Sequence, residues 1–155
     1  MLLNTILQAH AGVNGIGFDS PHVVAGAESA IHKARLTGRC RAVGGDFFKS
    51  VPAGGDAYLM KHIIHDWPDD RATTILRNCR KGVNPGGKLL LVELVIAPGN
   101  AADLGKVTDL EMLVIASGRE RTEVEYRQLL AGAGWRLTRV LPTKSPTQIV
   151  EAEPA

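Results

Sequence analysis

The residues best suited to chemistry lie in the run Lys61–Trp67, Lys-His-Ile-Ile-His-Asp-Trp. The run follows the short apolar segment 57–60, so in an α/β protein it would lie at the carboxyl end of a strand, where ligands bind. His65 can change protonation near neutral pH, while Asp66 and Trp67 add a carboxylate and a flat ring. This combination predicts a general base beside a bound aromatic or purine-like ligand.

Two further carboxylates come at the ends of predicted strands. Asp19 is placed to accept hydrogen bonds from both hydroxyls of a ribose, although it would also serve as a helix N-cap before Pro21. Asp46 adjoins Phe47, and such a pair could hold an adenine by its exocyclic amine and one ring face. The alternative for Asp46 is an ordinary strand-end turn followed by two core phenylalanines.

Two glutamates could assist the histidine. Glu93 ends an apolar strand and Glu120 lies between two arginines, so either could orient or charge-stabilise the imidazole of His65. Glu120 could equally be a solvated residue in a salt bridge. The spacing of His62 and His65 is compatible with a metal site, but the sequence shows no further cluster that supplies the missing ligands. We therefore predict no metal.

The pattern of apolar residues and turn signals defines the elements that must position these groups. Strands alternate with helices, which predicts an α/β fold with a mostly parallel, doubly wound sheet. The last two strands are expected to be antiparallel neighbours, and the continuously apolar strand 88–93 indicates a sheet covered on both faces. Helices are expected at 2–10, 21–30, 69–79, 103–115 and 122–132, and strands at 15–19, 41–46, 57–60, 88–93, 135–141 and 147–151.

Composition narrows the class of protein. The chain has 155 residues, of which 45% are hydrophobic and 22% charged, as in an ordinary globular domain. A net charge of +2 with scattered basic residues predicts no nucleic-acid partner, and no segment approaches the roughly 20 apolar residues of a membrane span. Cys40 and Cys79 lack metal-type spacing, which indicates reduced structural thiols in a cytoplasmic protein.

Six blocks in a particular order carry a family resemblance. The chain resembles the C-terminal catalytic domain of S-adenosylmethionine-dependent O-methyltransferases of the plant caffeate and bacterial polyketide type. The resemblance extends over nearly the whole chain. The blocks are Phe18–Val24, Gly45–Phe48, Lys61–Trp67, Asn84–Gly87, Leu91–Glu93 and Gly118–Thr122.

The resemblance implies a Rossmann-like methyltransferase sheet and a metal-independent transfer of a methyl group from S-adenosylmethionine to a hydroxyl. The acceptor would be a small aromatic or polyketide-like molecule, whose choice depends largely on the helix 103–115. It also implies a role for each matching residue. Asp19 would bind the cofactor ribose, Asp46 and Phe47 the adenine end and Lys61 the cofactor, with His65 as base, Asp66 beside the substrate, and Glu93 and Glu120 flanking the histidine.

The chain also departs from the family pattern. Met1 stands at the start of the first helix, where family members have a first strand and a glycine-rich loop before it. The N-terminal domain that builds the family's homodimer has no counterpart either. We therefore expect a truncated domain over 1–155 with its first strand missing, low stability, weak cofactor binding and little turnover.

Other functions stay open on the sequence. The main alternative is a non-catalytic remnant or interaction module that lacks a complete cofactor site. A nicotinamide-dependent oxidoreductase shares the acidic strand ends, but the chain has neither its glycine fingerprint nor residues arranged for hydride transfer.

Overall fold

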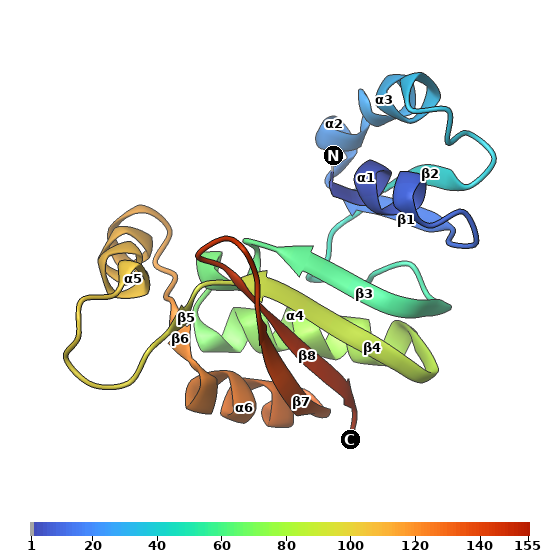
Figure 1. The fold of residues 1–155 in the computed structure, drawn as a ribbon. Helices are drawn as coiled ribbons and strands as arrows, with labels where there is room; N and C mark the ends of the chain where they lie inside the picture. Colours follow the sequence, from blue (N-terminus) through green and yellow to red (C-terminus); the bar gives the residue numbers. More distant parts are fainter. Residues whose placement is uncertain (1) are drawn as a thin grey trace. The chain divides into compact units, whose positions relative to one another are not determined.

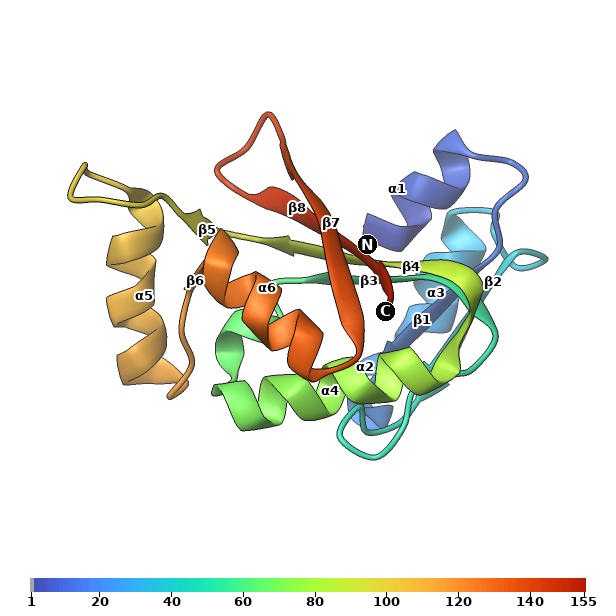
Figure 2. The same ribbon diagram turned by 90° about the horizontal axis from the view of Figure 1, so that it is seen from below.

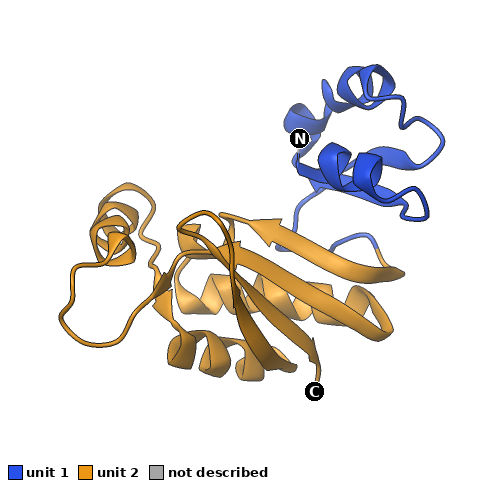
Figure 3. Ribbon diagram, viewed as in Figure 1, with its two compact units in different colours: residues 1–52 blue, residues 53–155 orange. Residues whose placement is uncertain are grey.

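The computed structural model describes residues 2–155, which form two compact units (Figure 3). Unit 1 extends to Pro52 and unit 2 runs from Ala53 to Ala155. Each unit has its own sheet and helices.

Unit 1 contains a two-stranded parallel sheet with three helices. Its elements are α1 (Leu2–Ala9), β1 (Gly15–Asp19), α2 (Pro21–Val24), α3 (Ala27–Lys33) and β2 (Cys40–Gly44). Strands β1 and β2 pair in parallel, so that Asp19 lies opposite Gly44 at the carboxyl ends. The acidic residues predicted to contact a cofactor thus follow neighbouring strands.

The core of unit 1 is small and apolar. It consists of Leu7, Ile31, Leu36 and Cys40. The helix expected over 21–30 is instead two helices, interrupted at Ala25 and Gly26. A glycine inside a helix destabilises it by roughly 0.5–1 kcal/mol, and here Gly26 becomes the N-cap of α3.

Unit 2 is built on a four-stranded sheet with strand order β3-β4-β8-β7. The strands are β3 (Gly55–Lys61), β4 (Val83–Glu93), β7 (Trp135–Pro142) and β8 (Gln148–Pro154). Strands β3 and β4 are parallel, whereas β8 is antiparallel to both β4 and β7. This confirms the predicted mixed α/β architecture with two antiparallel closing strands.

Two helices cover one face of this sheet. Helices α4 (Asp69–Gly82) and α6 (Glu123–Gly132) lie side by side against it (Figures 1 and 2). The indole nitrogen of the buried Trp135 donates to the carbonyl of Leu76, 2.9 Å away, and so ties β7 to α4. Helix α6 begins with the predicted capping box, in which Thr122 and Glu125 each accept a backbone N–H of the other.

Burial along β4 alternates. Leu89 and Leu91 are fully buried beneath the helices, whereas Leu90 and Val92 are only half-buried. Helices α4 and α6 thus cover the face that carries Leu89 and Leu91, and coverage of the other face stays a prediction. The turn predicted at 84–87 lies within β4 and interrupts its pairing with β3, and Gly86 has a φ of 76° there.

The remaining elements lie at the carboxyl ends of β3 and β4. The short helix η1 (Ile64–Asp66) follows β3, and the short strands β5 (Val95–Ile96) and β6 (Arg121–Thr122) pair in parallel. Helix α5 (Leu104–Ile115) projects beyond the sheet (Figure 1). Its apolar side is exposed, through Leu104, Val107, Leu110, Leu113, Val114 and Ile115.

Three other features concern the chain as a whole. Strands β1 and β3 belong to separate sheets. Among the helices described, none is long and apolar enough to cross a bilayer. Cys40 and Cys79 are buried free thiols, as expected for structural cysteines.

Candidate active site

His65 lies in the segment that connects β3 to α4. Strand β3 ends at Lys61, and the chain passes through His62, which has a φ of 52°, into η1. The imidazole of His65 is buried, with Nδ1 2.7 Å from Glu120 Oε1 and Nε2 3.4 Å from Asp66 Oδ1. The structure thus brings together three residues that the sequence predicts to act together.

Glu93 contacts the same segment from the end of β4. Its Oε1 accepts the backbone N–H groups of Ile63 and Ile64, at 3.1 and 2.9 Å. Its Oε2 lies 3.9 Å from His65 Nδ1. Burial raises the pKa of Glu93 to about 7, an effect that the nearby His65 and the two amides only partly offset. Glu93 therefore holds the backbone before His65 as well as facing its ring.

The environment of His65 determines which nitrogen is free. A carboxylate oxygen accepts, so Nδ1 carries the proton that is donated to Glu120 and Nε2 keeps its lone pair. Burial opposes protonation of the ring, but the hydrogen bond to Glu120 and the charge of Glu93 outweigh it, so the pKa of His65 is raised. This is the arrangement of an oriented base.

Arg121 is a positioning residue that the sequence analysis missed. Its side chain is 1% exposed and donates to the carbonyls of Ile64 and Trp67, at 3.1 and 2.9 Å, on either side of His65. It also donates to Asp69 Oδ1 at 2.7 Å from the start of α4. The guanidinium therefore joins the His65 segment to β6 and α4.

The backbone before Glu120 packs directly on the His65 segment. The N–H of Arg119 donates to the carbonyl of His65 at 2.9 Å, and the N–H of Glu120 donates to Asp109 Oδ1 at 2.8 Å. At Gly118, an added Cβ would lie 2.0 Å from the carbonyl oxygen of His65. Gly118 and Asp109 therefore set the distance between Glu120 and His65.

We expect Gly118→Ala to destabilise unit 2 by about 1–3 kcal/mol, because the new methyl group overlaps backbone that cannot move freely. Urea denaturation followed by tryptophan fluorescence measures this, since Trp67 and Trp135 both belong to unit 2. Gly132→Ala is the matched control, because a Cβ there meets no atom within 4 Å. Equal stability of the two variants would contradict the packing described here.

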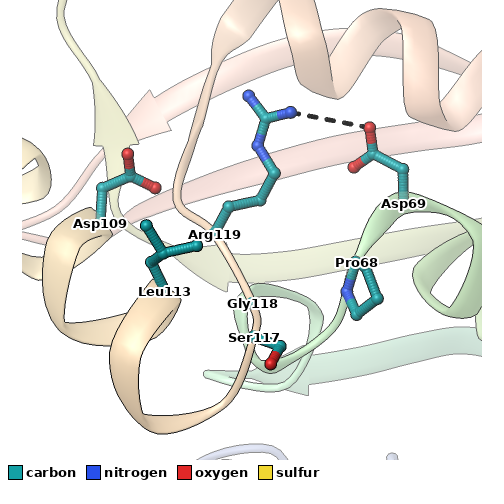
Figure 4. Close-up of a pocket in the computed structure, with 7 residues that line it drawn as sticks. All are labelled: Pro68, Asp69, Asp109, Leu113, Ser117, Gly118 and Arg119. Atoms are coloured by element: carbon teal, nitrogen blue, oxygen red, sulfur yellow. Dashed lines mark ion pairs between the residues drawn. The ribbon is translucent and has the colours of Figure 1, made fainter.

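Two hollows lie next to this site within unit 2. The larger, about 410 Å³, is lined by residues of α5, the 117–119 segment and the start of α4, and Figure 4 shows Arg119 reaching across it toward Asp69. The smaller, about 290 Å³, is bordered by Lys61 and His62 and by Leu104 of α5. None of the lining residues of the larger hollow was predicted to do chemistry.

Of the residues predicted to hold a cofactor, Asp19, Asp46 and Lys61 are exposed and Phe47 is half-buried. Asp19 ends β1 and accepts from Ser20 through Oδ1. Asp46 follows β2, where Oδ1 accepts the N–H of Phe48 and Oδ2 lies 3.7 Å from the ammonium group of Lys49. The rings of Phe47 and Phe48 pack edge to face, 4.8 Å apart. Lys61 ends β3 in unit 2 and is also exposed.

The structure is a Rossmann-like α/β scaffold with a buried histidine–carboxylate pair at its strand ends, the architecture of many enzymes, and comparison with known proteins identifies the family. The profile of the O-methyltransferase domain matches residues 1–136. A phenazine O-methyltransferase from Lysobacter antibioticus is 48% identical over 153 residues, which cover 99% of this chain and 45% of the relative.

Solved structures agree with the family match. The crystal structure of LaPhzM superposes with a TM-score of 0.94 at 47% identity, over 99% of this chain and 46% of that one. An O-methyltransferase from neocarzinostatin biosynthesis, solved with S-adenosylmethionine and 2-hydroxy-5-methyl naphthoic acid, superposes with a TM-score of 0.89 at 33% identity, over 99% and 45% of the two chains. This chain belongs to the S-adenosylmethionine-dependent O-methyltransferase family and spans less than half the length of these relatives.

Proposed function

We propose that this chain is a catalytic domain that transfers a methyl group from S-adenosylmethionine to a hydroxyl of a small aromatic or polyketide-like acceptor. The observation that carries the proposal is the buried pair of His65 Nδ1 and Glu120 Oε1, 2.7 Å apart. That contact leaves Nε2 free to take a proton, as a general base requires.

The proposed mechanism assigns each residue a task. Nε2 of His65 removes the acceptor's hydroxyl proton, and Glu120 stabilises the imidazolium that forms. Glu93 adds a second carboxylate facing the ring and fixes the preceding backbone through Ile63 and Ile64. Asp66, half-buried beside Nε2, is placed to contact the acceptor. None of these steps requires a metal ion.

The cofactor supplies an electrophilic methyl group, and exposed groups of this chain fit its polar parts. Among the described residues, the hydrogen bonds to Asp19 go to Oδ1, which leaves Oδ2 for a ribose hydroxyl, and Asp46 with Phe47 offers a carboxylate and a ring face for adenine. Lys61, at the end of β3, would contact the cofactor through its ammonium group. These four residues are the proposed cofactor-binding set.

The acceptor class is inferred from the relatives. One relative is a phenazine O-methyltransferase and another was solved with a naphthoic acid, and both compounds are flat aromatic molecules. Leu113 of α5 lines the larger hollow and Leu104 the smaller one, so α5 is the helix through which the acceptor would be selected. A homodimer is proposed for the full-length protein.

Cofactor binding is tested by titration calorimetry of the purified 155-residue chain with S-adenosylhomocysteine. We expect Asp46→Ala to weaken binding by about 10- to 150-fold, because a hydrogen bond to a charged group contributes roughly 1.5–3 kcal/mol. Glu28→Ala is the control, since Glu28 is an exposed carboxylate of α3 outside the proposed site.

Two outcomes would count against this function for the chain alone. A folded chain that does not bind S-adenosylhomocysteine would favour the alternative, a non-catalytic module without a complete cofactor site. Equal binding by Asp46→Ala and the parent chain would remove Asp46 from the cofactor-binding set.

A further inference from the structure

The surroundings of His65 contain two buried carboxyl groups beside one buried imidazole. The side chains of Glu93 and Glu120 are both fully buried. The Oε2 atom of each has no hydrogen-bond partner among the described residues. Buried charges in proteins are normally paired or coordinate metals, so these two oxygens point to a cation.

A second histidine faces one of these unpartnered oxygens. Nδ1 of His62 and Nδ1 of His65 each lie 3.9 Å from the same atom, Glu93 Oε2. The two imidazole rings are 5.2 Å apart between centroids. One ligand atom from each of the three residues lies within 4.8 Å of the other two. The sequence analysis lacked a third ligand here, and Glu93, distant in sequence, supplies it.

We infer that His62, His65 and Glu93 form a binding site for a divalent transition-metal ion such as Zn²⁺. Imidazole nitrogens and carboxylate oxygens are the ligands that Zn²⁺ takes at about 2.0–2.2 Å in tetrahedral sites. Ligand atoms in such a site lie about 3.3 Å apart, so the two 3.9 Å contacts need to close by about 0.6 Å and the histidine pair, within 4.8 Å, by up to about 1.5 Å. Glu120 Oε1 is hydrogen-bonded to His65 Nδ1 at 2.7 Å, so it would have to move away by about 0.6 Å to serve as the fourth donor.

Charge and access both suit the ion. A charge of +2 balances the two buried carboxyl groups when both are ionised. The side chain of His62 is 39% exposed and borders the hollow of about 290 Å³, which gives the ion a path from solvent. The left-handed backbone at His62 is a conformation that histidine and asparagine adopt more readily than most residues.

The ion would act as an inhibitor rather than a cofactor, a consequence that rests on the proposed function. Coordination at Nδ1 of His65 displaces the proton held there, and the neutral ring then carries its single proton on Nε2. The proton lost from Nδ1 to solvent is replaced by one gained at Nε2, so the neutral ring releases no net proton when the ion binds. Nε2 becomes a donor and cannot accept the hydroxyl proton of a methyl acceptor.

The test is titration calorimetry of the purified 155-residue chain with Zn²⁺, for the parent, His62→Asn and His32→Asn. Asparagine tolerates the left-handed backbone of residue 62, and His32 is an exposed histidine of α3 outside the cluster. We expect one ion per parent chain. Affinity should be at least about 10-fold weaker in His62→Asn, since even outer-shell changes weaken metal sites 10- to 100-fold. His32→Asn should match the parent.

A spectroscopic measurement completes the test. Co²⁺ in place of Zn²⁺ should give the intense visible absorption of a tetrahedral complex with the parent chain, and His62→Asn should reduce it. Equal Zn²⁺ affinity in the parent and His62→Asn, or an octahedral Co²⁺ spectrum, would overturn the inference. Titration with S-adenosylhomocysteine is independent of both results, so failure of the metal site and failure of the proposed function can be told apart.

Discussion

His65→Gln is expected to lower the rate of methyl transfer by about 10²- to 10⁴-fold, the usual contribution of a positioned general base. Glutamine keeps a polar side chain next to Glu120 but cannot take the acceptor's proton. The rate should be measured under single-turnover conditions with labelled S-adenosylmethionine and a panel of aromatic hydroxyl compounds. Affinity for S-adenosylhomocysteine should be unchanged, because His65 is not in the proposed cofactor-binding set.

The pH profile separates a base from a purely structural histidine. Only unprotonated His65 can act, and its pKa is raised above the ordinary value of 6.5. The parent rate should therefore rise with pH through a midpoint above 6.5, and His65→Gln should show no such rise. His32→Gln serves as the control. A His65→Gln rate within a few-fold of the parent would remove His65 as the base.

Arg121→Met should destabilise unit 2 by roughly 2–4 kcal/mol, because the carbonyls of Ile64 and Trp67 would lose a buried donor. The effect is less than that of breaking a fully buried ion pair, since Asp69 is 58% exposed and can be rehydrated. Urea denaturation followed by tryptophan fluorescence gives the free energy of unfolding.

Arg127→Met is the matched control for this prediction. Arg127 pairs with Glu123 at 2.8 Å on the exposed side of α6, and such surface pairs contribute about 0–1 kcal/mol. If Arg121→Met loses no more stability than Arg127→Met, Arg121 does not hold the His65 segment in place.

Much of the fold follows from local patterns in the sequence. Strand β1 has the predicted bounds, the capping box starts α6 at Thr122, and β7 and β8 are antiparallel neighbours as expected. These features depend on residues close in sequence, where side-chain period and turn chemistry are informative. The apolar side of α5 was also visible, but periodicity cannot say what that side faces, and in the structure it is exposed.

The candidate site was less accessible to sequence reasoning. Glu93 could be placed from its strand-end position, whereas Glu120 lies 55 residues from its partner His65 and could equally have been a solvated residue in a salt bridge. Arg119 and Arg121 flank Glu120 symmetrically in sequence, yet Arg121 is buried and Arg119 is 43% exposed. Only the three-dimensional path of β6 separates their roles.

The position of Glu93 has a consequence for how this site can change over evolution. One carboxylate oxygen holds the backbone of Ile63 and Ile64, and the other faces His65. A substitution there would alter the shape of the loop and the basicity of the ring in a single mutational step. Selection on the loop shape therefore constrains the basicity of the ring, and the reverse also holds. Inherited variation in this protein should accumulate at positions that affect only one of these two properties.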